Sequence, residues 1–187
     1  MISASVVTFK SDREELTVLL NCALHSAIDK IYMIDNSPTD ELRDLATSSS
    51  KIEYCFGQGN IGYGVAHNIG IRKSIAAGAT YHVVLNPDVQ FAPDVIEKLA
   101  NYMNENRDVG QVMPRVIYPN GELQYLCKLL PTPMDLIGRR FMPWQGYVDR
   151  SNYQFEMRAS GYDQLMEVPF LSGCFMFLRV EALKKVK

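Results

Sequence analysis

The stretch Tyr81-His82-Val83-Val84-Leu85-Asn86-Pro87-Asp88 carries the strongest indication of the fold. Its first five residues are mostly apolar, which predicts a buried strand, and the next three are polar or turn-forming residues that end the strand. In open α/β sheets, ligands bind beyond the carboxyl ends of the parallel strands. Asp88 is therefore expected at a ligand site, where its carboxylate is suited to hold a metal ion bound to a phosphate.

The composition is that of one folded domain without an overall excess of basic residues. The chain has 187 residues, of which 47% are hydrophobic and 21% charged, with a formal net charge of -2. That length suits a single compact domain. The charge balance provides no basic field for counterion release, so we expect no nucleic acid as the main partner.

The spacing of the cysteines and histidines and the shortness of the apolar runs indicate a cytoplasmic protein. The four cysteines and three histidines are scattered without metal-ligand spacing, so free thiols are expected and a zinc site is not. No apolar run reaches the roughly 20 residues of a membrane helix. We therefore expect a soluble chain.

Apolar segments alternate between strand and helix patterns along the first two thirds of the chain. Strands are predicted at 4–9, 31–34, 52–56, 81–85 and 109–118, and helices at 11–27, at 62–77 and from Pro93. Only the crossover between the second and third strands lacks a clear helix. This βαββαβαβ order predicts a mostly parallel sheet covered by helices on both faces, with short right-handed crossovers.

The same pattern predicts where the first helix begins and which face of the second helix is buried. Ser11 and Glu14 form a capping-box pattern at the start of the first helix. The expected inner face of the second helix carries Val65, Ala66, Ile69 and Ala76.

Polar clusters occur at the carboxyl ends of four predicted strands. They comprise residues 8–11, 35–40, 57–68 and 86–88. Any one of these clusters is also what a solvated turn between a strand and a helix looks like. Four of them at one edge of a parallel sheet favour a common ligand cleft.

Gly57-Gln58-Gly59-Asn60-Ile61-Gly62 matches the G-x-G-x-x-G pattern of dinucleotide-binding folds. This match keeps an NAD(P)-dependent oxidoreductase as an alternative. The fingerprint requires an acidic residue about 20 positions further on to hold a ribose hydroxyl. No Asp or Glu occurs between Gly62 and Asp88, which argues against this alternative.

Five motifs carry a more specific likeness through their order and spacing. They are Val6-Val7-Thr8-Phe9, Ile34 to Asp40 (I-D-N-S-P-T-D), Asn60 to Gly70 (N-I-G-Y-G-V-A-H-N-I-G), Leu85-Asn86-Pro87-Asp88 and Ser172-Gly173-Cys174. With these motifs the chain resembles the inverting, GT-A fold glycosyltransferases of family 2, particularly the rhamnosyltransferase-like members. The resemblance implies one α/β domain over 1–187, with a nucleotide-sugar-binding half at 1–119 and an acceptor-side half at 120–187.

The resemblance also implies roles for individual residues. Thr8 is expected to line the nucleotide pocket and Asp35 to meet the base, while Asn60 and Asn68 help to hold the nucleotide sugar. Gln124 and residues 131–133 match an aromatic segment of the rhamnosyltransferase-like relatives, which is expected to face the acceptor. Tyr125 and Trp144 are expected either to stack on a sugar or to pack in the core.

Asn86-Pro87-Asp88 stands where the family has its D-x-D motif. The resemblance implies that Asp88 binds Mg²⁺ or Mn²⁺ on the diphosphate, and that Asn86 contributes to nucleotide-sugar binding as a neutral neighbour. Mg²⁺ commonly takes one or two protein carboxylates and completes its shell with phosphate oxygens and water. One carboxylate is therefore enough at this position.

The catalytic base is expected beyond Lys187. Relatives carry it in an acidic motif downstream of the stretch that corresponds to Ser172-Gly173-Cys174, so this chain alone is expected to bind without turnover. Asp163 and Glu167 lie near this stretch in sequence, but they are better interpreted as surface acids. A noncatalytic nucleotide-sugar-binding module therefore remains an alternative.

The expected activity is transfer of a sugar from a nucleoside diphosphate sugar to a saccharide or lipid-linked acceptor, with inversion. The resemblance suggests dTDP-rhamnose as the donor and polysaccharide biosynthesis as the setting. It also suggests that the protein associates peripherally with the inner face of the cell membrane.

Overall fold

The computed structural model describes residues 1–130 and 145–185. Residues 131–133 and Trp144, which were expected to face the acceptor, lie outside this range. The chain divides into two compact units. Unit 1 comprises Met1–Pro114 and Gly173–Lys187, and unit 2 comprises Arg115–Ser172.

A six-stranded sheet forms the centre of unit 1, with the order β3-β2-β1-β4-β8-β5. The parallel strands are β1 (Ile2–Thr8), β2 (Lys30–Asp35), β3 (Ile52–Phe56) and β4 (Tyr81–Leu85). β8 (Phe175–Arg179) runs antiparallel to β4, and β5 (Gln111–Val112) runs antiparallel to β8. The predicted mostly parallel sheet is therefore confirmed.

The strand predicted at 109–118 is wrong in length, because only Gln111–Val112 pairs in the six-stranded sheet. Pro114 follows closely and has no backbone N–H to donate to a neighbouring strand. The apolar pattern thus continues past the point where pairing stops.

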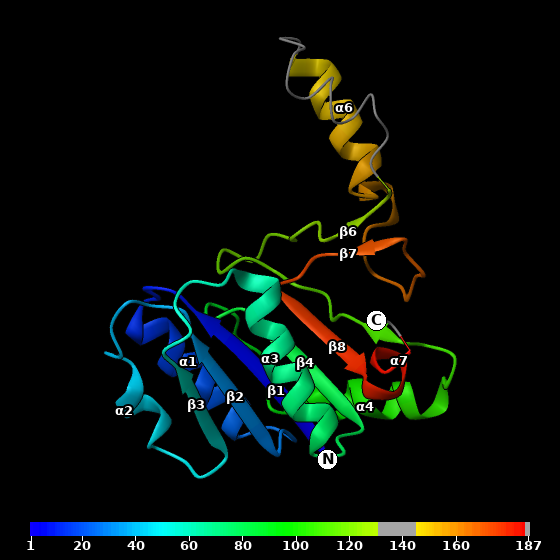
Figure 1. Cartoon of the computed structure of the whole chain (residues 1–187). Helices are drawn as coiled ribbons and strands as arrows, with labels where there is room; N and C mark the ends of the chain where they lie inside the picture. Colours follow the sequence, from blue (N-terminus) through cyan, green and yellow to red (C-terminus); the bar gives the residue numbers. More distant parts are fainter. Residues whose placement is uncertain (131–144, 186–187) are drawn as a thin grey trace. The chain divides into compact units, whose positions relative to one another are not determined.

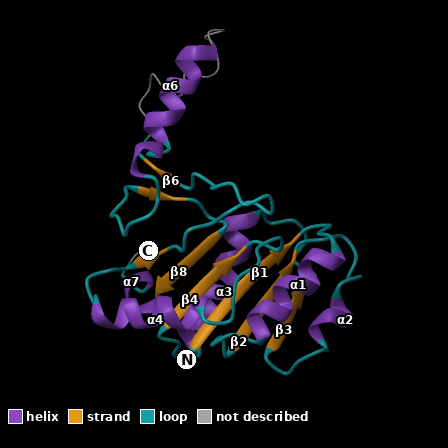
Figure 2. Ribbon diagram, turned by 180° about the vertical axis from the view of Figure 1, so that it is seen from behind, coloured by secondary structure: helices purple, strands orange, loops and turns teal. Residues whose placement is uncertain are grey.

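Helices cover both faces of the sheet, as predicted. α1 (Arg13–Leu24) and α4 (Val95–Glu105) lie on one face, and α3 (Tyr63–Ala76) lies on the other (Figures 1 and 2). The crossover without a predicted helix contains the short α2 (Arg43–Ala46), and α7 (Val180–Leu183) follows β8.

α1 is capped by Asp12, so the predicted capping box of Ser11 and Glu14 is wrong by one residue. Oδ1 of Asp12 accepts hydrogen bonds from the backbone N–H groups of Glu14 (2.8 Å) and Glu15 (3.0 Å). Ser11 Oγ instead accepts from the N–H of Phe9, at 3.3 Å. A carboxylate at the N-cap satisfies two free N–H groups and complements the positive end of the helix dipole.

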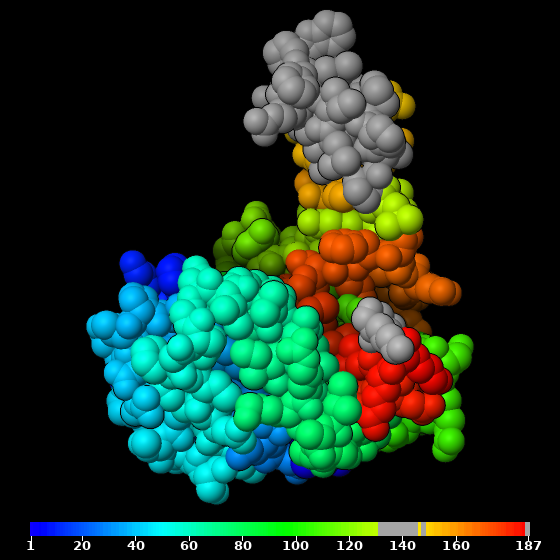
Figure 3. Space-filling view, viewed as in Figure 1, coloured from blue at the N-terminus to red at the C-terminus, as the bar shows by residue number. Residues whose placement is uncertain are grey.

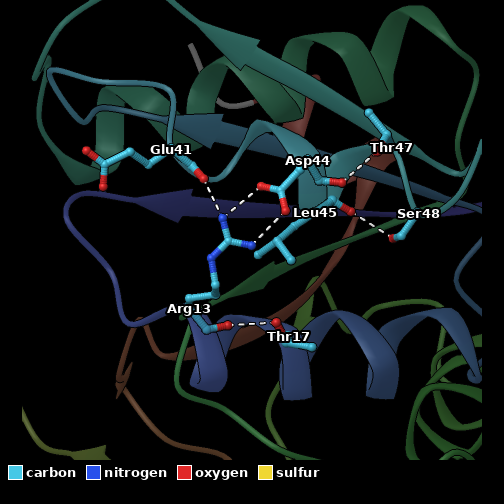
Figure 4. A network of polar contacts seen from close by, with 7 residues as sticks. All are labelled: Arg13, Thr17, Glu41, Asp44, Leu45, Thr47 and Ser48. Carbon is cyan, nitrogen blue, oxygen red and sulfur yellow. Dashed lines mark hydrogen bonds and ion pairs between the residues drawn. The ribbon is translucent and has the colours of Figure 1, made fainter.

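An ion pair connects the first turn of α1 to α2 (Figure 4). Arg13 Nη1 donates to Asp44 Oδ2 at 2.7 Å and Arg13 Nη2 to Asp44 Oδ1 at 2.8 Å, while Nη2 also donates to the carbonyl of Glu41. The hydrogen bond from Arg13 lowers the pKa of Asp44. The pair joins the segments that follow β1 and β2, beside the edge where those strands end.

The two faces of the sheet differ in polarity. Beneath α1 and α4 lies the main apolar core, which includes Ala4 and Val6 of β1. The face beneath α3 carries Ser3, Ser5 and His82, all fully buried. Because successive residues of a strand point to opposite faces, β1 directs Ala4 and Val6 to one layer and Ser3 and Ser5 to the other.

This polar layer explains why the predicted inner face of α3 is partly wrong. Ala66 is buried as expected, but the side chain of Val65 is exposed and so is Ala76. The other buried residues of α3 are His67, Gly70 and Ser74. α3 lies across the middle of this side of unit 1, in turquoise to green in Figure 3.

Unit 2 contains a two-stranded antiparallel sheet, β6 (Cys127–Lys128) with β7 (Phe170–Leu171), the helix α6 (Gln145–Phe155) and the 3-10 helix η1 (Arg158–Ser160). The hydroxyl of Tyr162 lies 2.7 Å from the carbonyl of Glu156 and accepts from the N–H of Cys127. Tyr125 packs edge-on against Tyr162 and beneath Arg158. Tyr125 therefore takes part in packing within unit 2.

None of the helices in the described part of the chain is both long and apolar enough to cross a bilayer.

Candidate functional site

A cleft of about 410 Å³ opens at the carboxyl ends of β1 and β4. β1 lies between β2 on one side and β4 on the other, so the strand order reverses at this point. Such a switch point is where ligands bind in open α/β sheets. Six of the lining residues are Phe9, Asn36, Asn60, Tyr63, Asn86 and Asp88.

The Asn86-Pro87-Asp88 turn occupies one side of the cleft. The N–H of Asn86 donates to the carbonyl of Cys174 at 2.9 Å, next to β8, and the N–H of Val89 donates back to the carbonyl of Asn86. Asp88 is exposed. The turn is thus held by its backbone while the Asp88 carboxylate is free to meet a ligand.

Asn60 belongs to the glycine-rich loop that precedes α3. Its Oδ1 accepts from the N–H of Gly62 at 3.1 Å. Gly57, Gly59 and Gly62 all have positive φ, and no side chain caps the helix at Gly62. This conformation, which residues other than glycine rarely adopt, brings the start of α3 to the cleft.

Asp35 is fully buried, and its carboxylate binds protein groups rather than facing the cleft. Oδ2 accepts from the Tyr54 hydroxyl at 2.6 Å and Oδ1 from the N–H of Ser37 at 2.9 Å. Burial, followed by this contact with Asp35, raises the pKa of Tyr54. The next residue, Asn36, lines the cleft, so Asp35 supports the cleft from behind.

Thr8 and Asn68 also lie outside the residues that line the cleft. Thr8 is fully buried, and its Oγ1 has no hydrogen-bond partner within the described part of the chain. Val7 and Phe9, on either side of it, line the cleft instead. Asn68 is exposed on α3. Of the six predicted binding residues, the structure brings Asn60, Asn86 and Asp88 together at the cleft.

Tyr63 is a cleft residue to which the sequence pattern assigned no role. Its hydroxyl oxygen lies 2.9 Å from Asn86 Oδ1 and 2.7 Å from the carbonyl oxygen of Gly173. Burial raises the pKa of Tyr63 to about 12, and the neighbouring Cys174 and Asp88 add to this effect. The one sequence signal was its position as the first residue of a helix that follows a glycine-rich loop.

The side chains that line the cleft are suitable ligands for a divalent cation that is bound to a diphosphate. Among residues 1–130 and 145–185, no cluster of three or more His, Cys, Asp or Glu side chains could hold a metal ion without other ligands. Asp12 and Glu15 line the cleft as well as Asp88. One carboxylate together with phosphate oxygens and water satisfies Mg²⁺ or Mn²⁺. The residues present therefore fit the expected cation.

Similar solved structures define the class of fold. Staphylococcus aureus TarS 1-349 matches with a TM-score of 0.61 at 13% identity, over 98% of this chain and 48% of that chain. The mannosyltransferase PcManGT from Pyrobaculum calidifontis, in complex with GDP-Man and Mn²⁺, matches with a TM-score of 0.61 at 14% identity, over 99% and 46%. The fold is that of the GT-A glycosyltransferases.

Sequence comparison narrows the class to a family. The dTDP-rhamnosyl transferase RfbF of Shigella flexneri is 31% identical over 111 residues, which cover 58% of this chain and 37% of that protein. The hexosyltransferase Agl10 of Haloferax volcanii, named for low-salt glycan biosynthesis, is 29% identical over 121 residues, or 64% and 38%. The family model described as glycosyl transferase family 2 matches residues 3–187, and the chain belongs to this family.

The chain thus spans 37% and 38% of the lengths of these two relatives. Membership of the family does not support the alternative of a dinucleotide-binding oxidoreductase.

Proposed function

We propose that this chain binds a nucleoside diphosphate sugar with Mg²⁺ or Mn²⁺ and forms the donor site of an inverting glycosyltransferase. The observation that carries this proposal is the cleft at the β1 and β4 ends, with the exposed Asp88 and its neighbour Asn86 on its wall. Support comes from PcManGT, whose structure contains GDP-Man and Mn²⁺, and from TarS, whose structure has been determined with UDP-GlcNAc.

In this proposal each cleft residue has its own role in binding the nucleoside diphosphate sugar. Asp88 supplies the protein carboxylate for the cation, which neutralises the charge that develops on the departing diphosphate. Asn86 and Asn60 provide neutral amide groups for the nucleotide sugar, and Asp35 and Thr8 support the cleft from the ends of β2 and β1. Asn68 is a weaker candidate, because it is exposed on α3 and does not line the cleft.

The acceptor hydroxyl must lose a proton to a base as it attacks the sugar. We give this role to none of the described residues: Asp163 and Glu167 are exposed acids of unit 2. For the donor we propose dTDP-rhamnose, supported by the likeness to RfbF, and for the acceptor a saccharide or lipid-linked saccharide.

Calorimetric titration of the chain with dTDP, UDP and GDP, each with and without Mn²⁺, tests the proposal. NAD⁺ serves as the comparison ligand. We expect one of the nucleoside diphosphates to bind more tightly when Mn²⁺ is present, and NAD⁺ not to bind. Binding of NAD⁺ without metal, together with no response to the three diphosphates, would refute the proposed function.

A noncatalytic binding module predicts the same binding. Mass-spectrometric detection of sugar transfer, or of slow hydrolysis of the donor, by the protein in which this chain naturally occurs separates the two functions.

A further inference from the structure

The hydroxyl of Tyr63 joins three segments around the cleft. Tyr63 is the first residue of α3, Asn86 is the first residue after β4, and Gly173 lies shortly before β8. The phenol oxygen lies 2.9 Å from Asn86 Oδ1 and 2.7 Å from the carbonyl oxygen of Gly173. The Tyr63 ring also packs edge-on against His67, one helical turn further on.

A phenol hydroxyl carries a single hydrogen, so it cannot donate to two oxygens at full strength. The Gly173 carbonyl can only accept, and it makes the shorter contact. The amide of Asn86 can either accept through Oδ1 or, turned by 180°, donate through Nδ2. Only the turned amide satisfies all three groups at once.

We propose that Tyr63 is a positioning residue that orients the Asn86 amide. In this arrangement the Tyr63 hydroxyl donates to the Gly173 carbonyl, and Nδ2 of Asn86 donates to the Tyr63 oxygen. The carbonyl oxygen Oδ1 of Asn86 is then the end of the amide that Tyr63 does not engage.

The orientation of the Asn86 amide determines which of its atoms faces the cleft next to Asp88. A free Oδ1 is a neutral oxygen of the kind that Mg²⁺ and Mn²⁺ accept as a ligand. A free NH₂ group in the same place would direct hydrogens at the cation. This inference therefore rests on the proposed function. It states that the hydrogen bond to Tyr63 makes Oδ1, and not Nδ2, the atom of Asn86 that faces the cation.

The first test uses the metal-free chain and needs no ligand. The side-chain amide of Asn86 is followed by ¹H–¹⁵N NMR, with its signal assigned from the Asn86→Ala variant. We expect its protons to exchange with water at least tenfold more slowly than those of the exposed Asn68, and this protection to disappear in Tyr63→Phe. The control Tyr118→Phe alters an exposed tyrosine of unit 2 and should change nothing. Equal exchange at Asn86 and Asn68 in the unaltered chain would overturn the inference.

The second test measures binding of the diphosphate that the unaltered chain prefers. Tyr63→Phe should weaken the Mn²⁺-dependent affinity about tenfold, as expected for one lost hydrogen bond, and change the metal-free affinity less than twofold. Adding Tyr63→Phe to Asn86→Ala should cost nothing further, because Tyr63 acts through Asn86. Additive losses would contradict the inference. If the unaltered chain binds no nucleotide, the proposed function fails while the NMR result still decides the orientation of Asn86.

Discussion

Ser5 Oγ lies 2.7 Å from Nδ1 of His67, so that β1 and α3 are joined by a hydrogen bond inside the molecule. The same hydroxyl lies 2.9 Å from Nε2 of His82, whose Nδ1 lies 2.9 Å from Ser3 Oγ. Ser3 in turn contacts Ser74 of α3 at 2.6 Å. A chain of neutral hydroxyls and imidazoles thus fills the layer between β1, β4 and α3.

Acid should destabilise the protein through these two histidines. Burial lowers the pKa of His67 from 6.5 to about 4 and, with His67 adding to the effect, that of His82 from 6.5 to about 3. Between these values and 6.5 the unfolded chain binds more protons than the folded one. Stability is therefore fully present above pH 6.5 and falls with decreasing pH, by up to about 1.4 kcal/mol per pH unit for each histidine.

Urea unfolding at pH 7, 6, 5 and 4.5 measures this loss. The control is His25→Gln, which removes a histidine that is exposed and should leave the pH dependence unchanged. His67→Gln should reduce the slope between pH 6 and 4.5. An equal slope in His67→Gln and in the unaltered chain would show that the acid sensitivity has another source.

Gly70→Ala should destabilise the contact between α3 and β1. A Cβ at position 70 would lie 2.6 Å from Cβ of Ser5, which is too close for two carbon atoms, so the helix must move. We expect the free energy of unfolding to fall by about 1–3 kcal/mol.

The matched control is Gly64→Ala in the same helix. A Cβ there meets nothing within 4 Å, so the change should be neutral or raise stability by roughly 0.5–1 kcal/mol. Denaturant unfolding of both variants gives the comparison. Similar effects at the two positions would mean that helix propensity, and not the close approach to Ser5, decides the outcome.

Asp88→Asn should remove the metal-dependent part of nucleotide binding. Asp88 is exposed, so the fold and the thermal midpoint should stay unchanged. We expect the affinity measured with Mn²⁺ to drop at least tenfold toward the metal-free value, because the cation loses its protein carboxylate. Calorimetry with and without Mn²⁺ measures both values, and the exposed Asp108→Asn is the control. A variant that keeps its Mn²⁺ dependence would exclude Asp88 as the metal residue.

Asp35→Ala should lower both stability and nucleotide affinity, the latter even without metal. The substitution leaves the Tyr54 hydroxyl and the N–H of Ser37 without their acceptor, at a cost of about 1–3 kcal/mol. The affinity falls because Asn36, the next residue, loses its support at the cleft. Tyr54→Phe removes only one of the two contacts and should have the smaller effect in both assays. Unchanged metal-free affinity in Asp35→Ala would separate Asp35 from the binding site.

The sequence was sufficient to predict the site residues that directly follow a strand of the sheet. The apolar run before Asn86, with polar residues directly after it, placed Asn86 and Asp88 at the ligand edge, and the structure has them on the cleft wall. The same pattern could not tell which neighbour faces the cleft. Val7 and Phe9 line it whereas Thr8 does not, because alternate residues of a strand point in opposite directions.

The sequence alone indicated the four parallel strands and the three long helices of unit 1, and the sheet edge at which the cleft opens, because hydrophobic periodicity and turn residues are local signals. Three-dimensional packing, in contrast, turns Asp35 inward to Tyr54 and brings Tyr63 to Asn86 and Gly173. These contacts join residues from separate elements, and Tyr63 and Gly173 are 110 positions apart. Their existence depends on how the strands pair and how α3 packs on β1, which no local pattern of residues contains.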